Sequence, residues 1–167
     1  VSVQPGRLAR PTTRSVETSD APLGEGEHQV AVRAESNVGV SQGLWSFYVD
    51  RSPPTVSIEA IAPYSPRSPT TIRYTASDLV SPNLLAVRCD LYDSNNNLVA
   101  NIGSEEALSK GEHFFSLDPA TLSPVTLDPT THAPYIPDGT YNIKIKAFDL
   151  AYNNSIAEQS IVIDSTP

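Results

Sequence analysis

The 167-residue sequence has no methionine and a single cysteine, Cys89. Because a newly made chain begins with Met, we expect Val1 to be a cleavage point or a boundary, and the chain to be a fragment of a larger protein. One cysteine excludes an internal disulfide and leaves the redox compartment undecided. Alternation over residues 84–92 places Cys89 among the inward-facing side chains, where it would act as a small hydrophobic residue.

Long apolar runs and basic clusters are also missing. The apolar runs are a few residues long, well short of the roughly 20 that a membrane-spanning helix needs. No signal-peptide pattern opens the chain, so no membrane insertion of this segment is expected. Eleven Lys and Arg face 19 Asp and Glu, for a formal net charge of −8. The basic residues are scattered and form no stripe that could neutralise phosphates, which excludes nucleic acid as an expected partner.

Proline, β-branched residues and tyrosine are abundant instead. Fifteen prolines and many short runs of Val, Ile, Thr and Tyr are typical of strands separated by turns. No window keeps a helical period. The composition therefore predicts an all-β fold, a β-sandwich of the Ig-like or fibronectin-like kind.

An internal repeat refines this prediction. The stretch "GEHQVAVRAE" at 26–35 matches "GTYNIKIKAF" at 139–148, and each is followed by an Asn-containing turn and a second strand that ends in Asp-x-Ser/Thr-Pro. Alternation puts four matched positions on one face of each first strand. These are His28, Val30, Val32 and Ala34 in the first copy, and Tyr141, Ile143, Ile145 and Ala147 in the second.

The repeat predicts parts of two consecutive modules. Residues 1–50 would be the C-terminal part of an Ig-like module, 51–54 a proline linker, 55–164 a complete sandwich, and 165–167 the start of the next linker. Pro53 and Pro54 cannot donate to a ladder and favour an extended backbone, which suits a stiff joint.

The complete module is expected to have seven strands. Tyr141 follows "PDG" at the start of the sixth, where sandwich domains place a corner tyrosine that stabilises the fold. The predicted strands are 55–61, 70–76, 84–92, 98–102, 112–117, 141–148 and 158–163.

The first module is incomplete. Its residues supply the last two strands of a sandwich and at most one more, "VSVQP", and half a sandwich cannot bury both faces of its sheet. We therefore expect that another chain, or a separate portion of the same protein, completes it. The alternative is that residues 1–23 pack irregularly.

Four segments carry a family resemblance. In order and spacing, "SPTTIRYTASD", "LAVRCDLYDSNNNLV", "SKGEHFFSLD" and "IPDGTYNIKIKAFD" resemble the Ig-like domain of the flagellar hook-capping family, a module that also recurs in tandem in bacterial surface and secreted proteins. The resemblance covers residues 63–167, and the first copy resembles the broader bacterial Ig-like repeat. It implies a spacer, adhesive or assembly module and brings no catalytic residues.

Metal sites have two candidates. The string "DSNNN" at 93–97 resembles the opening of a calcium loop but lacks the glycine and the closing glutamate, so a hairpin turn is favoured. At the joint, Asp50 could bind calcium together with carboxylates of the neighbouring turns, namely Glu35, Asp78 and Asp149. The alternative is that Asp50 only caps its turn. None of the three histidines has a second His or Cys at zinc-ligand spacing.

The long connection at 118–137 departs from the family pattern and is the candidate interaction loop. His132, Tyr135 and Ile136 are its candidate contact residues. A proline-stiffened loop that shields the sheet edge is an equally open interpretation. Asn153, in the sequon "NNS", is interpreted as a turn residue.

Together these patterns predict a non-enzymatic structural or adhesive segment of a large bacterial protein, extracellular at the cell surface or secreted. Its partners would be other modules or chains of the same assembly, and no cofactor is expected apart from calcium at the joint. No nucleophile elbow or opposed carboxylate pair indicates an enzyme. The alternative is a carbohydrate-binding or accessory module of a secreted enzyme, which would need clustered aromatic residues. A flagellar hook-cap scaffold would predict one module rather than two.

Overall fold

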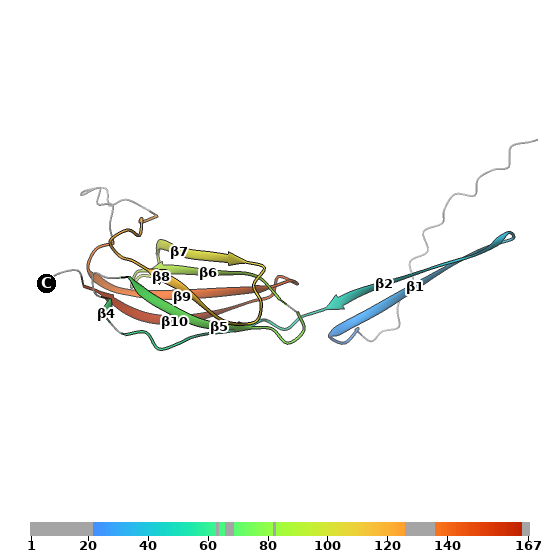
Figure 1. Cartoon of the computed structure of the whole chain (residues 1–167), viewed down its shortest axis with the longest axis horizontal. Coiled ribbons are helices and arrows are strands. Elements are labelled where there is room, and N and C mark those ends of the chain that lie inside the picture. Colours follow the sequence, from blue (N-terminus) through green and yellow to red (C-terminus); the bar gives the residue numbers. More distant parts are fainter. Residues whose placement is uncertain (1–21, 63, 66–68, 82, 126–135, 165–167) are drawn as a thin grey trace, which may run out of the picture.

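The computed structural model describes residues 22–62, 64–65, 69–81, 83–125 and 136–164 (Figure 1). Every regular element among them is a strand, and none of these residues forms a helix that could cross a membrane. The strands are β1 (Gly26–Ser36), β2 (Gly39–Val49), β3 (Thr55–Ile58), β4 (Tyr64–Ser65), β5 (Thr70–Ser77), β6 (Leu84–Tyr92), β7 (Leu98–Glu106), β8 (Gly111–Leu117), β9 (Gly139–Asp149) and β10 (Asn154–Ile163).

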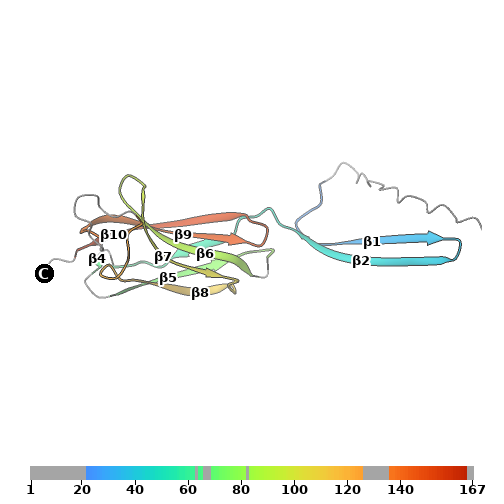
Figure 2. The ribbon, with the colours of Figure 1, turned by 90° about the horizontal axis from the view of Figure 1, so that it is seen from above.

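Strands β3 to β10 form a sandwich of two sheets, which Figures 1 and 2 show from two directions. The larger sheet has the order β4-β10-β9-β6-β7, and the smaller has the order β3-β5-β8. All pairs are antiparallel except β4 with β10. The fold is thus an all-β, Ig-like sandwich.

The strand predicted at 55–61 is shorter in the structure, and a separate short strand follows it. Strand β3 ends at Ile58 in the smaller sheet, and β4 joins the larger sheet by pairing with Val162 and Ile163 of β10. Two other predicted strands are longer than expected, because β7 continues to Glu106 and β10 begins at Asn154. Alternation locates the inward-facing residues well, but it does not mark where one strand ends and the next begins in the other sheet.

The core lies between the two sheets. On β9 the side chains at alternate positions from Tyr141 to Ala147 are buried, and those between them are partly exposed. Tyr74 of β5 is fully buried at the centre, where its ring stacks on Phe115 with centroids 5.2 Å apart. Its hydroxyl donates to Oε2 of Glu105 over 2.8 Å, which satisfies the one polar atom that this ring carries into the core.

Strands β1 and β2 form a separate two-stranded hairpin that projects from one end of the sandwich (Figures 1 and 2). The hairpin is paired over its whole length, from Gly26 with Val49 to Ser36 with Gly39. Within the described residues β1 pairs with no strand other than β2. An isolated hairpin of this kind has little stability of its own in water.

Hydrogen bonds connect the residue just before β1 to the first residues of the linker that follows β2. The Glu25 carboxylate, just before β1, accepts hydrogen bonds from the Arg51 amide at 2.9 Å and the Ser52 hydroxyl at 2.8 Å. Beyond them Pro53 is exposed and Pro54 is buried. The two ends of the hairpin are therefore held together where the chain enters the sandwich.

Candidate functional site: an acidic cluster at the joint

Three carboxylates meet where the hairpin joins the sandwich. Asp50 follows β2, Asp78 follows β5, and Asp149 ends β9. One oxygen from each lies within 4.8 Å of the other two. Strand ends far apart in the sequence thus bring three acids to one place.

Asp78 is held by its own turn. Its Oδ1 accepts hydrogen bonds from the amides of Val80 at 2.8 Å and Ser81 at 2.6 Å. Its Oδ2 is buried and has no hydrogen-bond partner among the described residues. Because the side chain is only 6% exposed, water does not readily satisfy this oxygen.

Asp149 is the most deeply placed of the three, with no exposed surface. Its Oδ1 accepts from the amides of Ala151 at 2.8 Å and Asn153 at 2.9 Å, and its Oδ2 accepts from the Asn153 side chain at 2.9 Å. The same Nδ2 of Asn153 lies 3.2 Å from the carbonyl oxygen of Asp50. Asn153 therefore serves both the β9–β10 turn and the joint, which supports its interpretation as a turn residue rather than a glycan acceptor.

Asp50 completes the cluster from the hairpin side. Its Oδ1 accepts from the Ser52 amide at 3.2 Å, as expected of a residue that caps its turn. Its Oδ2 accepts from the Ser81 hydroxyl at 2.7 Å, a contact to the sandwich. Asp50 thus has both the capping role and a place among the three acids.

The cluster concentrates negative charge. None of the ion pairs found among the described residues involves its three carboxylates. Lys110 is nearby, but its Nζ donates to the main-chain oxygen of Asp78. Burying carboxylates without a counter-charge is costly, and a set of carboxylate oxygens is the donor set that hard cations prefer.

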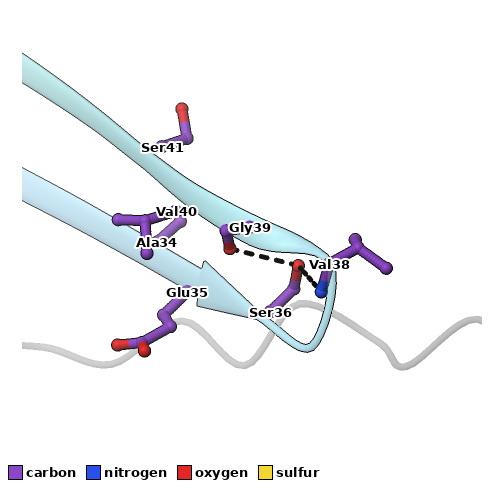
Figure 3. A pocket seen from close by; sticks show the side chains of 7 residues that line it. All are labelled: Ala34, Glu35, Ser36, Val38, Gly39, Val40 and Ser41. Atoms are coloured by element: carbon purple, nitrogen blue, oxygen red, sulfur yellow. Dashed lines mark hydrogen bonds between the residues drawn. The ribbon is translucent and has the colours of Figure 1, made fainter.

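Glu35 does not belong to this site, and its inclusion among the candidates was wrong. It lies at the far tip of the hairpin, paired with Val40, and its carboxylate is 3.3 Å from Nη2 of Arg33. Figure 3 shows this tip, where an open hollow is lined by seven residues between Ala34 and Ser41. Strand β1 leads away from the joint, so the turn after it is the part of the hairpin most distant from Asp50.

The string "DSNNN" forms the β6–β7 turn. Asp93 Oδ1 accepts from the amides of Asn95 at 2.9 Å and Asn97 at 2.8 Å, and Oδ2 accepts from the Asn97 side chain at 2.9 Å. The Asn97 side chain and amide, followed by the Asn95 amide, lower the pKa of Asp93. Asn96 has a φ of 65°, which Asn tolerates better than most residues.

This turn repeats the geometry of the β9–β10 turn. In each, an Asp and the Asn four residues later make the same set of hydrogen bonds, and the residue before the Asn has a positive φ. The two loops read Asp-x-x-x-Asn in the sequence. They differ in surroundings, because Asp93 is at the exposed end of a hairpin and Asp149 is buried at the joint.

Cys89 and Tyr141 lie in the sandwich. Cys89 is fully buried on β6 between Gly103 of β7 and Ile145 of β9, and burial, reinforced by Asp90, raises the pKa of its thiol. The Tyr141 hydroxyl donates to the carbonyl oxygen of Pro137 over 2.9 Å, the contact typical of a tyrosine corner.

The candidate interaction loop is described only at its ends. His132 and Tyr135 lie outside the described residues. Ile136 is 2% exposed and packs in the core, so its prediction as an external contact residue was wrong. Ile136 lies three residues before the start of β9, so its side chain can join the core that β9 helps to form.

One face of the hairpin is an unexpected second feature. Cross-strand pairing places Val30 beside Trp45 and His28 beside Phe47 on the same face, with the His28 and Phe47 rings 5.7 Å apart. Trp45 is 56% exposed and Phe47 is 41% exposed. The stretch "LWSFYV" does not show this face by alternation, because Leu44 and Tyr48 of the opposite face are also large apolar residues, 62% and 60% exposed.

Comparisons with known proteins support the fold. No family model and no curated protein matches the sequence. Among solved structures, dimeric latent PorU from Porphyromonas gingivalis matches with a TM-score of 0.51 and 14% identity, over 86% of this chain. The chain spans only 13% of that PorU chain. At this identity the likeness shows the fold alone.

Two other similar structures come from adhesion proteins. A tetra-tandem repeat from the extending region of a large adhesion protein has a TM-score of 0.41 and 20% identity, over 87% of this chain and 33% of that one. A 1.5-MDa bacterial ice-binding adhesin has a TM-score of 0.34 and 16% identity, over 84% of this chain and 43% of that one.

Proposed function

We propose that the chain is a non-enzymatic, structural Ig-like segment of a large bacterial protein, extracellular at the cell surface or secreted. In this proposal the sandwich is a spacer, and the β1–β2 hairpin is an assembly element whose missing strands come from elsewhere. The proposal depends mainly on one observation. The apolar face of the hairpin is exposed, whereas the matching face of β9, with Ile161 and Ile163 of β10, is buried.

The repeat provides the comparison position by position. Val30 and Val32 are 45% and 49% exposed, and the matched Ile143 and Ile145 have no exposed surface. Phe47, which pairs with His28, corresponds to Ile161, which pairs with Tyr141 and is 1% exposed. The hairpin thus has the apolar residues of a core-facing surface, but these residues are exposed.

The unpaired edge of the hairpin also supports the proposal that additional strands complete it. Strand β9 has β10 on one side and β6 on the other, whereas β1 has only β2 among the described residues. The complete module therefore shows what the hairpin lacks, namely a strand equivalent to β6 at its edge and a sheet equivalent to β3-β5-β8 over its apolar face. We propose a β-rich polypeptide segment with alternating apolar residues as the occupant, from another chain or another part of the same protein.

Site-specific photocrosslinking tests this proposal. A photoreactive amino acid replaces Trp45 in the protein expressed in its native cells, and the same replacement at Ser46 is the matched control on the opposite face. After illumination, mass spectrometry should identify a β-strand peptide attached at position 45 and little at position 46. Equal crosslinking at both positions, or none at 45 in the native protein, would contradict the proposal.

The carbohydrate-binding alternative has one observation in its favour. Trp45 and Phe47 lie on one face of β2 and are partly exposed, as in a platform for a sugar ring. Crosslinking of position 45 to a glycan instead of a peptide would support this alternative and reject the assembly role.

A further inference from the structure

We propose that the acidic cluster of Asp50, Asp78 and Asp149 binds a divalent cation, calcium by preference, and that the ion fastens the hairpin to the sandwich. The proposal is independent of what covers the hairpin face. It starts from the distance among the three carboxylates, which is at most 4.8 Å between the candidate ligand atoms. After small side-chain shifts, an ion between such oxygens would lie 2.3–2.6 Å from each of them, which is the usual calcium–oxygen distance.

The unpartnered oxygen of Asp78 is the second observation. A buried carboxylate oxygen without a hydrogen bond is rare in folded proteins, because the loss of its hydration is not compensated. The other oxygen of the same carboxylate is engaged by two amides, which fix the side chain in its orientation. The Asp78 carboxylate, with one buried oxygen that has no partner, is therefore held beside two other acids, as a preorganised ligand would be.

The surrounding hydrogen bonds fix the remaining ligands as well. Asp149 is oriented by two amides and by Asn153, and Asp50 is oriented by the Ser52 amide and the Ser81 hydroxyl. Such outer contacts hold ligand carboxylates in place in known metal sites. All candidate ligand atoms at the cluster are oxygens, and this excludes the softer metals that prefer nitrogen and sulfur ligands.

Calcium fits this arrangement better than magnesium. Calcium takes six to eight oxygens in irregular geometry, so three carboxylates and water suffice without a strict octahedron. Magnesium requires near-ideal octahedral geometry and keeps most of its water. The positive charge of Lys110 is directed at the Asp78 carbonyl oxygen, which leaves the three carboxylates to the ion.

The ion would join two parts of the molecule. Asp50 belongs to the end of the hairpin, whereas Asp78 and Asp149 belong to the sandwich. A cation held by all three adds a bond between these parts that is stronger than the Ser81–Asp50 hydrogen bond alone. Calcium would therefore set the angle of the hairpin and the stiffness of the joint.

Thermal unfolding of the full chain in millimolar CaCl2 and in EDTA tests the proposal. At about 100-fold excess over Kd, calcium should raise Tm by roughly 10 °C. The same concentration of MgCl2 should raise it much less. An unchanged Tm, together with no heat of binding in calorimetric titration with CaCl2, would overturn the proposal.

Two variants make the test specific. Asp78→Asn keeps the two amide contacts but removes one charge, so it should abolish the response to calcium while its Tm in EDTA stays equal to or above that of the unchanged protein. Asp93→Asn alters the same kind of loop away from the cluster and should keep the full calcium response. If Asp78→Asn does not fold, Asp50→Asn on the more exposed side replaces it. An undiminished calcium response in these cluster variants would overturn the proposal.

Discussion

The Ser81 hydroxyl donates to Oδ2 of Asp50 over 2.7 Å. This hydrogen bond joins the residue that follows β2 of the hairpin to the β5–β6 loop of the sandwich. The Ser81 amide donates to Asp78, and the Asn153 side chain of the β9–β10 turn donates to the Asp50 carbonyl oxygen. Asp50 is thus bound to two loops of the sandwich. The joint is more than a flexible linker between two independent elements.

Asn153→Ala should weaken the joint, whereas Asn97→Ala should not. Both substitutions remove the side-chain donor of an Asp-x-x-x-Asn turn, but only Asn153 also contacts the carbonyl oxygen of Asp50. Loss of hydrogen bonds to a buried carboxylate should lower the free energy of unfolding by about 1 to 3 kcal/mol in Asn153→Ala. Denaturant unfolding measures this change.

Hydrogen exchange separates the two roles of Asn153. The amides of Arg51 and Ser52 should exchange faster in Asn153→Ala and at the original rate in Asn97→Ala. If both variants leave exchange at the joint unchanged, Asn153 acts only within its own turn.

Tyr141→Phe should destabilise the sandwich by about 1 kcal/mol, the usual contribution of one hydrogen bond. The variant keeps the buried ring and leaves the carbonyl oxygen of Pro137 without the hydroxyl at 2.9 Å. Tyr152→Phe is the matched control, because Tyr152 is 74% exposed at the tip of its turn. Urea denaturation of both variants measures the difference, and an equal effect of the two would contradict a tyrosine corner.

The core was predictable because it depends on local alternation. The positions from Tyr141 to Ala147 and Cys89 are buried on strands whose apolar period is two. The meeting of Asp50, Asp78 and Asp149 was only partly predictable, since turn carboxylates can be identified from the sequence but their distances depend on topology. Glu35 was included as a carboxylate of a neighbouring turn, but its turn lies at the tip of the hairpin, away from the joint.

Ile136 shows a different limit. Its position in a long Pro- and Thr-rich connection indicated an external role, but a single apolar side chain can enter the core from a connection without any periodic signal. The first predicted strand, which ends early at Ile58, is a similar case. Periodicity shows which residues face inward, whereas the sheet that a strand joins is decided by contacts far along the chain.

Alkaline pH should destabilise the protein through Tyr74 and Cys89. Burial, together with Glu105 for Tyr74, raises both pKa values above the ordinary 10.0 and 9.0. The unfolded chain therefore loses these protons first. Their contribution is complete below about pH 9 and falls as pH rises, by about 1.4 kcal/mol per pH unit for each group once its unfolded form is ionised.

Urea denaturation at several pH values above neutrality measures this dependence. Tyr74→Phe loses the hydrogen bond to Glu105 and should be less stable at pH 7, but its stability should fall less steeply above pH 10. Cys89→Ala should likewise flatten the first part of the decline. Equal slopes in the unchanged protein and both variants would show that other groups govern the alkaline limb.

The final prediction compares two matched positions of the repeat, Val30 and Ile143. Ile143 has no exposed surface, so Ile143→Ala should cost about 2 to 5 kcal/mol by loss of buried apolar area and creation of a cavity. Val30 is 45% exposed, so Val30→Ala should change the stability of the isolated chain by no more than about 0.5 kcal/mol. In a longer protein that supplies the missing strands, Val30 would be buried, and the same substitution should then become costly. Denaturant unfolding of both variants in both contexts measures the difference. A large cost of Val30→Ala in the isolated chain would mean that this face is already covered there, and a negligible cost in the longer protein would mean that no partner sheet covers it.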